Sequence, residues 1–271
     1  FSLKQEGISY LCSSDLPAVI VDVQRIGCGL GDIFMGQGDY WQLTRGGGHG
    51  DYHTLVLAPA SVQESVELAS EAFDLAEKYR HPVIMATDAT IGQMMEPVEL
   101  PEMREHDMDK FDWAVRPRCE GEEQRAIWNR YWDWEDGGRK YPEYVLNKYT
   151  EMEENEQRWE NFYTDDADIV IVAYGTSSRI AKSAVLRARK EGIKVGLLRP
   201  ITLWPYPKNA FDQLPHVKAF LDAEMNILGQ MKDDIILADK NRRPVEFFGS
   251  YWDPINEFEL AAKAREMAER Y

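Results

Sequence analysis

The chain is short of cysteine, and the few it has exclude several kinds of site. Its three cysteines, Cys12, Cys28 and Cys119, are far apart and form no Cys-x-x-Cys pair. This pattern excludes a self-contained four-cysteine iron–sulfur or zinc site. An odd, sparse count is also typical of a reducing compartment rather than of a disulfide scaffold.

Basic residues and long apolar runs are scarce as well. The chain has 31 Lys and Arg against 47 Asp and Glu, for a net charge of −16. Nucleic-acid binding needs a basic face, so this charge argues against such a partner. No apolar run approaches the roughly 20 residues that cross a bilayer, and no signal peptide is visible. We therefore expect a cytoplasmic protein without membrane contact. The sequence opens inside a helical pattern without Met, so we expect further residues upstream.

The first hundred residues alternate helical and strand patterns. We predict a helix over residues 1–11, strands over 18–23, 54–58 and 83–86, and a glycine-rich loop over 25–53. The run at 18–23 is typical of a strand covered on both faces. A capping box at residues 61–64 starts a helix, whose predicted apolar face comprises Val62, Val66, Ala69, Phe73 and Ala76. Strand, helix, strand in this order indicates a parallel sheet.

A charged, aromatic segment separates this part from a second α/β unit. Residues 101–165 show no strand pattern, and we predict a polar helix over 151–162. The tryptophans of the segment indicate either an inter-domain or inter-subunit contact, or an aromatic satellite core; they are Trp113, Trp128, Trp132, Trp134 and Trp159. From residue 166 we predict strands at 169–173, 194–198, 217–223 and 244–248, a helix after Gly175, and a closing helix.

Arg25 is the first candidate site residue. It follows the first strand, and ligands of parallel sheets lie beyond the carboxyl ends of the strands. Its guanidinium fork suits a carboxylate; a salt bridge to a nearby acid is the alternative. We expect the glycines after it, Gly27 and Gly29, to shape the loop.

A second glycine-rich stretch, Gly46-Gly47-Gly48-His49-Gly50-Asp51-Tyr52, is the most unusual in the chain. Four glycines carry a large entropy cost on ordering, so a ligand or partner is expected to approach the backbone closely. The spacing is not that of a P-loop. His49 can exchange a proton, although a lone loop histidine is more often a hydrogen-bonding spacer.

Two corners of the second unit complete the candidates. Gly175, Thr176 and Ser177 open a helix, where backbone N–H groups can bind an anion; an N-cap by Ser or Thr is the favoured alternative. Glu224 and Asn226 end a predicted strand and form a ligand or interface corner. The adjacent Asp233 and Asp234 are expected to be solvated, and we predict no metal site.

Together these stretches resemble the alpha subunit of the 2-oxoacid:ferredoxin oxidoreductases, most closely the branched-chain 2-oxoisovalerate type. The resemblance covers nearly the whole chain outside residues 101–165. The matching segments, in the order of the family, are "SLKQEGISYL", "LPAVIVDVQR", "GLGD", "GGGHGDY", "VLAPASVQE", "GQMMEPVE", "ADIVIVAYGTSSRIAKSAV", "GLLRPITLWP" and "EMN" with "GQM".

The resemblance implies an incomplete thiamine-diphosphate-binding domain of the pyrimidine type at residues 1–100, a linker or interface segment at 101–165, and a transketolase C-terminal-like α/β domain at 166–271. Family enzymes decarboxylate a 2-oxoacid on thiamine diphosphate, pass the electrons through iron–sulfur clusters to ferredoxin and the acyl group to coenzyme A. The implied partners are a beta subunit with the diphosphate-binding domain and Mg²⁺, and gamma and ferredoxin-like delta subunits. The clusters belong to partners, and Arg25 matches the arginine that contacts the substrate carboxylate. The loop at residues 46–52 is then expected to line the pocket near the thiazolium and the partner, together with Gly27 and Gly29.

Two departures from the family pattern limit what can be carried over. The N-terminal portion of the family, with the glutamate that protonates the aminopyrimidine, is not in this sequence. Ile26 and Cys28 also stand where this type usually has Gly and Pro, which leaves the loop shape and the substrate preference open. The alternatives are the same reaction on 2-oxoglutarate or pyruvate, and a non-catalytic assembly subunit.

Overall fold

The computed structural model describes residues 1–103, 110–115, 121, 125–131 and 138–271. The helices are η1 (Ser2–Lys4), α1 (Gln5–Ser13), α2 (Tyr40–Thr44), α3 (Val62–Tyr79), α4 (Ala89–Gln93), α5 (Tyr141–Asn155), α6 (Gly175–Lys190), α7 (Lys208–Asp212), α8 (Lys232–Ala238) and α9 (Glu257–Arg270). The strands are β1 (Ala18–Gln24), β2 (Leu55–Leu57), β3 (Pro82–Asp88), β4 (Trp159–Phe162), β5 (Ile169–Val172), β6 (Val195–Pro200), β7 (Thr202–Trp204), β8 (Ala219–Glu224) and β9 (Val245–Gly249).

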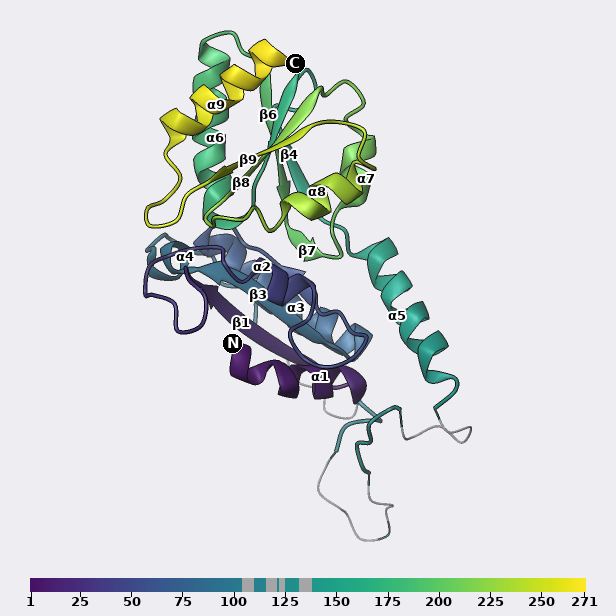
Figure 1. The fold of residues 1–271 in the computed structure, drawn as a ribbon. Helices are drawn as coiled ribbons and strands as arrows, with labels where there is room; N and C mark the ends of the chain where they lie inside the picture. The colour runs from purple at the N-terminus through teal and green to yellow at the C-terminus, as the bar shows by residue number, and fades with distance from the viewer. Residues whose placement is uncertain (104–109, 116–120, 122–124, 132–137) are drawn as a thin grey trace.

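The strands form two sheets, one above the other in Figure 1. The first has the order β1-β3-β2-β7 and the second the order β4-β6-β5-β8-β9. The predicted parallel pairing is confirmed for β1, β3 and β2, and β6, β5, β8 and β9 of the second unit are also parallel. β7 and β4 are antiparallel edge strands. The predicted α/β class is therefore confirmed, and β7 joins the first sheet although its sequence lies between elements of the second.

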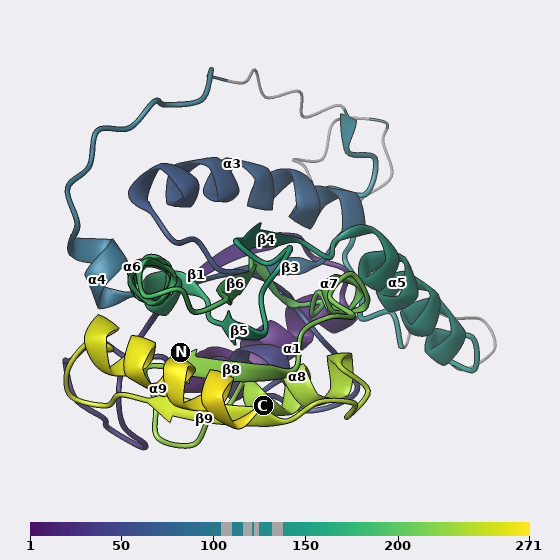
Figure 2. The same cartoon turned by 90° about the horizontal axis from the view of Figure 1, so that it is seen from above.

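Helices cover both faces of each sheet. Figure 2 shows α3 and α1 on opposite sides of the first sheet. Helices α6 and α9 pack on one face of the second sheet, where their apolar residues form a separate core cluster. A larger cluster includes residues of α3, of the first sheet and of α7 and α8. One continuous core therefore joins the two units. Among the described residues, no helix has the length and apolar composition needed to cross a membrane.

Several helical predictions need correction. The glycine-rich loop contains a short helix, α2, because Tyr40 and Leu43 reach the core. The buried face of α3 is formed by Leu68, Ala72, Leu75, Ala76 and Tyr79. The predicted Phe73 is instead 59% exposed. The capping box is half confirmed: Ser61 accepts a hydrogen bond from Glu64 N, but the Glu64 carboxylate accepts from Ala60 N.

Strand predictions fail at the sheet edges. β1 is an edge strand, and Val21 and Val23 are 61% and 51% exposed, so it is not covered on both faces. The predicted helix over 151–162 ends at Asn155, and residues from Trp159 form β4 because the exposed edge of β6 pairs with them. Trp159 packs on the main core, whereas Trp128 is 64% exposed. Trp132, Trp134 and Cys119 lie outside the described residues.

Candidate functional site at the carboxyl end of the first sheet

The segment after β1 folds back on itself and surrounds Arg25. Arg25 forms an isolated antiparallel bridge with Met35, and Ile26 N donates to Phe34 O at 3.3 Å. The Ile26 side chain is 2% exposed, and a Cβ at Gly36 would approach its Cγ2 to 2.5 Å. Ile26, which departs from the family pattern, therefore fills the inside of the loop.

Gly27 is required by the shape of this loop. Its φ is +108°, and an added Cβ would lie 2.5 Å from Gly31 Cα. Both conditions exclude a larger residue. Gly29 also has a positive φ, of +61°, but open space surrounds the position of its Cβ. Gly29 therefore serves the backbone conformation alone.

The Arg25 side chain is exposed at the mouth of the loop. Its Nη1 donates to the carbonyl oxygen of Asp32 at 3.3 Å. No carboxylate of the described residues forms an ion pair with it, so the alternative of a structural salt bridge is not found. A guanidinium in this state can bind an incoming carboxylate without first breaking an ion pair.

Two buried polar atoms lie on β1 just before Arg25. Asp22 is 6% exposed and its Oδ2 has no hydrogen-bond partner. Burial, with a contribution from the charge of Asp39, raises the pKa of Asp22 to about 7. Gln24 Oε1 accepts from Tyr174 Oη at 3.2 Å, while Gln24 Nε2 has no partner. Sequence analysis missed both residues, although a polar residue ending an apolar strand is a usable signal.

The predicted corner at Gly175, Thr176 and Ser177 meets the first sheet. Tyr174 is the N-cap of α6 and makes no side-chain cap, so the favoured capping by Ser or Thr is wrong. The carboxylate of Asp88, at the end of β3, accepts from Thr176 N at 3.3 Å and from Thr176 Oγ1 at 2.8 Å. The anion at this helix N-terminus is thus a side chain of the chain itself.

Glu224 and Asn226 are buried at the end of β8. Glu224 accepts hydrogen bonds from Asn226 Nδ2 at 2.8 Å and Met231 N at 2.9 Å. Asp222 is on the same strand, and neither of its carboxylate oxygens has a hydrogen-bond donor. Burial raises the pKa of both carboxyls, and the charge of Glu224 raises that of Asp222 further. Two such acids cannot both ionise without a large cost.

The second glycine-rich stretch lies at the other end of the sheet. It leads into the start of β2, and Leu55 is in register with Val83, whereas Gln24 is in register with Asp88. Five residues at about 3.3 Å each separate these levels by about 17 Å. Figure 1 shows the two stretches as dark loops at opposite ends of the first sheet. One copy of the chain therefore does not bring Arg25 and His49 into a single pocket.

This stretch packs on α1 instead. Gly47 N donates to Gln5 Oε1 at 3.2 Å, and Gly48 N donates to Tyr52 Oη at 2.8 Å. A Cβ at Gly48 would lie 2.5 Å from Gln5 O, so contact with α1 explains this glycine. His49, Gly50 and Asp51 are exposed.

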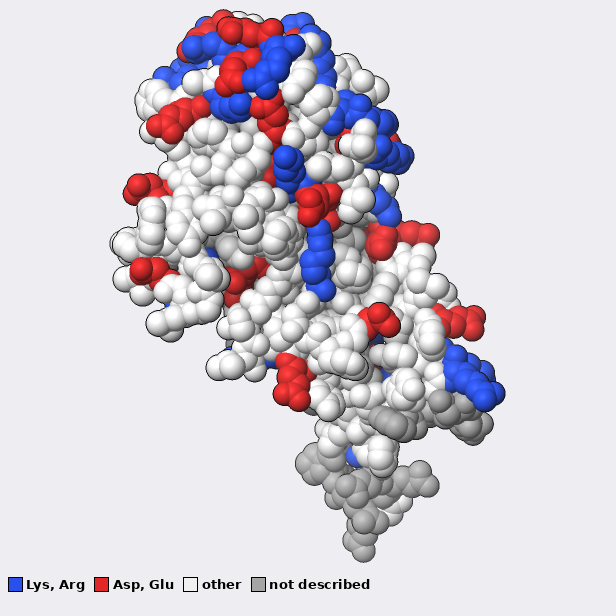
Figure 3. All heavy atoms as spheres, viewed as in Figure 1, with Lys and Arg blue, Asp and Glu red and all other residues white. Residues whose placement is uncertain are grey.

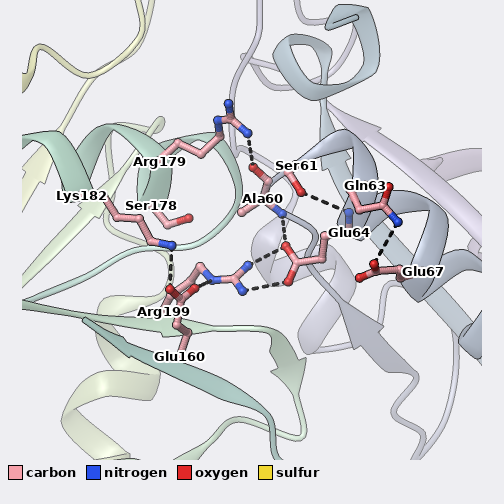
Figure 4. Close-up of a pocket in the computed structure, with 10 residues that line it drawn as sticks. All are labelled: Ala60, Ser61, Gln63, Glu64, Glu67, Glu160, Ser178, Arg179, Lys182 and Arg199. Carbon is pink, nitrogen blue, oxygen red and sulfur yellow. Dashed lines mark hydrogen bonds and ion pairs between the residues drawn. The ribbon is translucent and has the colours of Figure 1, made fainter. Parts of the chain in front are cut away.

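A pocket of about 490 Å³ opens where α3, α6, β4 and β6 meet (Figure 4). Arg199 is its central residue and donates to both oxygens of Glu64 at 2.7 and 2.8 Å. It also pairs with Glu160 at 2.8 Å, and Lys182 pairs with Glu160 at 2.6 Å. Since these charges are already paired with one another, we interpret the pocket as a network of ion pairs that joins the two units, rather than as a ligand site.

The prediction that Asp234 is solvated is wrong. Tyr40 Oη donates to Asp234 at 2.5 Å and Arg45 pairs with it at 2.9 Å, which ties α2 to α8. In the parts of the chain that the structure describes, no group of three or more His, Cys, Asp or Glu is arranged to hold a metal ion.

Comparison with family models gives two matches. Residues 1–161 match the model described as pyruvate flavodoxin/ferredoxin oxidoreductase, thiamine diphosphate-binding. Residues 167–251 match pyruvate:ferredoxin oxidoreductase core domain II.

Individual relatives agree with these matches. Ketoisovalerate oxidoreductase subunit VorB of Methanothermobacter thermautotrophicus is 48% identical, with 98% of this chain aligned to 75% of that protein. 2-Oxoglutarate synthase subunit KorA of Methanocaldococcus jannaschii is 33% identical over 89% of this chain and 73% of that protein. A solved 2-oxoglutarate:ferredoxin oxidoreductase from Magnetococcus marinus has the same fold, with a TM-score of 0.77 at 21% identity, over 98% of this chain and about half (51%) of that chain.

Proposed function

This chain belongs to the pyruvate and 2-oxoacid:ferredoxin oxidoreductase family, and on that premise we propose that it is a subunit of an enzyme that oxidatively decarboxylates a branched-chain 2-oxoacid. The products are an acyl-CoA and CO2, and the electrons pass to ferredoxin. The relatives named as ketoisovalerate oxidoreductase subunits are 48% and 47% identical, whereas four relatives named as 2-oxoglutarate synthase subunits are 31–33% identical; this difference supports the branched-chain substrate.

The exposed guanidinium of Arg25, which forms no ion pair with a carboxylate of the described residues, carries the proposal. It lies beyond the carboxyl end of β1, where ligands of parallel sheets bind. We assign it the substrate carboxylate, which two parallel N–H donors can hold in a bidentate pair. Gly27 and Gly29 shape the loop that presents it. The stretch from Gly46 to Asp51 lies at the far end of the sheet, and we assign it to contact with another subunit.

Two buried polar atoms near Arg25 fit the polar groups of a cofactor. Asp22 Oδ2 and Gln24 Nε2 lie on the same face of β1, and neither has a hydrogen-bond partner. When bound, thiamine diphosphate supplies the carbon nucleophile and the electron sink for decarboxylation. This chain would provide one wall of the site, orient the oxoacid through Arg25 and exclude water. We propose that a beta subunit holds the diphosphate with Mg²⁺ and that partners hold the iron–sulfur clusters.

The surface beside Arg25 suits a partner subunit. Leu30 and Ile33 are 87% and 84% exposed, and Phe34 contacts Trp252 edge-to-face at 5.9 Å between ring centroids. Figure 3 shows that charged side chains crowd the top of the molecule and are sparse over these loops. Exposed apolar groups of this size favour burial against another protein. We propose the beta subunit here, with gamma and ferredoxin-like delta subunits elsewhere in the complex.

We further propose that residues 1–100 and 166–271 act as two functional domains, with residues 101–165 between them. The matches to two family models, over 1–161 and 167–251, support a division near residue 165. Pairing of β2 with β7 links the two proposed domains, and pairing of β4 with β6 links the segment 101–165 to the second.

The proposal is tested by replacing Arg25 in the purified complex. Arg25→Ala should weaken carboxylate binding by about 2–5 kcal/mol. This loss should lower kcat/KM for 3-methyl-2-oxobutanoate roughly 30- to 4,000-fold. The assay is coenzyme-A-dependent viologen reduction with a panel of 2-oxoacids, and Arg139→Ala, at another exposed arginine, is the control. Unchanged kinetics in the Arg25 variant would remove Arg25 from the site. No turnover of any oxoacid by the intact, cluster-loaded complex would favour the assembly role instead.

A further inference from the structure

The loop that carries Arg25 makes most of its hydrogen bonds to the second unit through Gln37, beside a bond from Gln230 Nε2 to Gly38 O and the ring contact of Phe34 with Trp252. The Gln37 side chain is 0% exposed, although it belongs to a loop whose tip, from Gly27 to Phe34, is mostly open to solvent. A fully buried glutamine must have its polar atoms satisfied. Its partners therefore show what the loop is built to contact.

All of the polar partners of Gln37 lie in the second unit. Gln37 N donates to Met225 O at 2.8 Å, and Gln37 Oε1 accepts from Met225 N at 2.9 Å. Gln37 Oε1 also accepts from Ser177 Oγ at 2.6 Å, while Nε2 donates to Tyr174 O at 3.0 Å. Asn226 Nδ2 donates to Gln37 O at 3.1 Å. Five hydrogen bonds thus connect one residue to the carboxyl ends of β5 and β8.

The second unit holds these partners firmly. Glu224 fixes the amide of Asn226 through its hydrogen bond to Nδ2, and Asn226 Oδ1 accepts from Gly229 N at 2.8 Å. Ser177 lies in the first turn of α6, whose preceding residue, Tyr174, is fully buried. The amide of Gln37 consequently binds groups that the second unit already holds in place, namely Tyr174 O, Ser177 Oγ and Met225 N.

Residues next to Gln37 lie directly on Arg25. Met35 bridges Arg25, and a Cβ at Gly38 would lie 2.9 Å from Arg25 O. Gly36 is equally close, because its added Cβ would lie 2.9 Å from Arg25 C. Movement of residue 37 by an ångström would therefore move the backbone of Arg25. Misplacement on that scale can change catalytic rates greatly.

We propose that Gln37 is a positioning residue through which the second domain sets the geometry of the carboxylate-binding arginine. This inference rests on the proposed role of Arg25. It assigns the buried corner formed by Ser177, Met225 and Asn226 a part in substrate binding, although none of these residues contacts the substrate. The corner sets the position of Arg25, and the arginine then selects oxoacids by the placement of their carboxylate.

The test is a double-mutant cycle in the intact complex. Gln37→Met keeps the approximate size of the side chain and removes its three side-chain hydrogen bonds, while the two backbone bonds to Met225 and Asn226 remain. We expect it to raise KM for the oxoacid about ten- to hundredfold while kcat falls less, and to accelerate amide hydrogen exchange over residues 26–36. Thr176→Val is the matched control, because it removes a buried hydrogen bond at the same junction without touching the loop. It should leave both readouts unchanged.

The second arm of the cycle separates positioning from general destabilisation. If Gln37 acts through Arg25, Gln37→Met should have no further effect on KM in an Arg25→Ala background. An equal effect in both backgrounds, or unchanged hydrogen exchange over residues 26–36, would overturn the inference. If Arg25→Ala alone leaves KM unchanged, the proposed function of Arg25 fails, and the hydrogen-exchange result still decides whether Gln37 orders the loop.

Discussion

At the scale of single residues, two charged side chains at neighbouring strand ends differ in how many hydrogen bonds the protein offers them. Arg25 follows β1 and has one carbonyl contact, whereas Asp88 ends β3 and accepts four hydrogen bonds. These come from Thr90 N, Ile91 N, Thr176 N and Thr176 Oγ1. Both residues are polar ends of apolar strands in the sequence. Only the structure shows that one is saturated by the protein and the other is available.

Asp88 should therefore matter for stability rather than for binding. Because it accepts N–H groups at the starts of both α4 and α6, Asp88→Ala removes two helix caps, at about 1 kcal/mol each. We expect the free energy of unfolding to fall by about 2 kcal/mol, measured by denaturant titration. Asp88→Asn keeps one acceptor oxygen and should lose less. Equal losses in the two variants would show that the carboxylate acts by charge alone.

At the scale of elements, sequence patterns predicted most of the long elements and failed on those defined by their neighbours. The long helix α5 was an exception, because only its last five residues were predicted as helix. Runs such as Ile169–Val172 are apolar enough to indicate buried strands by themselves. β7 has three residues and β4 has four, and each exists because an exposed sheet edge pairs with it. The site shows the same limit. Arg25 and its glycines were found from their place after a strand, whereas Gln37 gave no signal because its partners are about 140 and 190 residues away.

The buried face of α3 allows a direct test of one such failure. The periodic pattern favoured Phe73, but the structure buries Leu75 at 5% exposure and leaves Phe73 59% exposed. Leu75→Ala should cost about 2–5 kcal/mol of unfolding free energy. Phe73→Ala should stay within about 0.5 kcal/mol of the wild type. Calorimetric or denaturant unfolding of both variants decides the orientation of the helix, and the reverse order would contradict it.

At the scale of the whole molecule, one buried histidine links stability to pH. His81 is 1% exposed, its Nε2 lies 2.6 Å from His53 O, and its Nδ1 has no partner. Burial, with a contribution from the charge of Lys148, lowers the pKa of His81 to about 3. The unfolded chain takes up this proton near pH 6.5 and the folded chain does not. Stability from this group is therefore complete above pH 6.5 and is lost as the pH falls towards 3.

The expected size of this effect is measurable at mild acidity. Between pH 7 and pH 5 the wild type should lose about 2 kcal/mol of unfolding free energy through His81. His81→Gln retains a donor for His53 O and does not titrate. Between pH 7 and pH 5 the unfolding free energy of this variant should therefore fall by about 2 kcal/mol less than that of the wild type. Parallel pH profiles of the two proteins would contradict the assignment. Carboxylates titrate equally in both, which makes the difference specific to residue 81.

The position of β7 has a consequence for how the chain must be made. The strand Thr202–Trp204 completes the first sheet, but it is synthesised after β4, α6 and β6 of the second. During translation the edge of β2 therefore stays unpaired until more than a hundred further residues have been synthesised. During that interval a neighbouring nascent chain can offer its own β7 to this edge. Slow translation or high expression should for this reason favour intertwined dimers, and a gene split before residue 202 would encode two pieces that each lack part of a sheet.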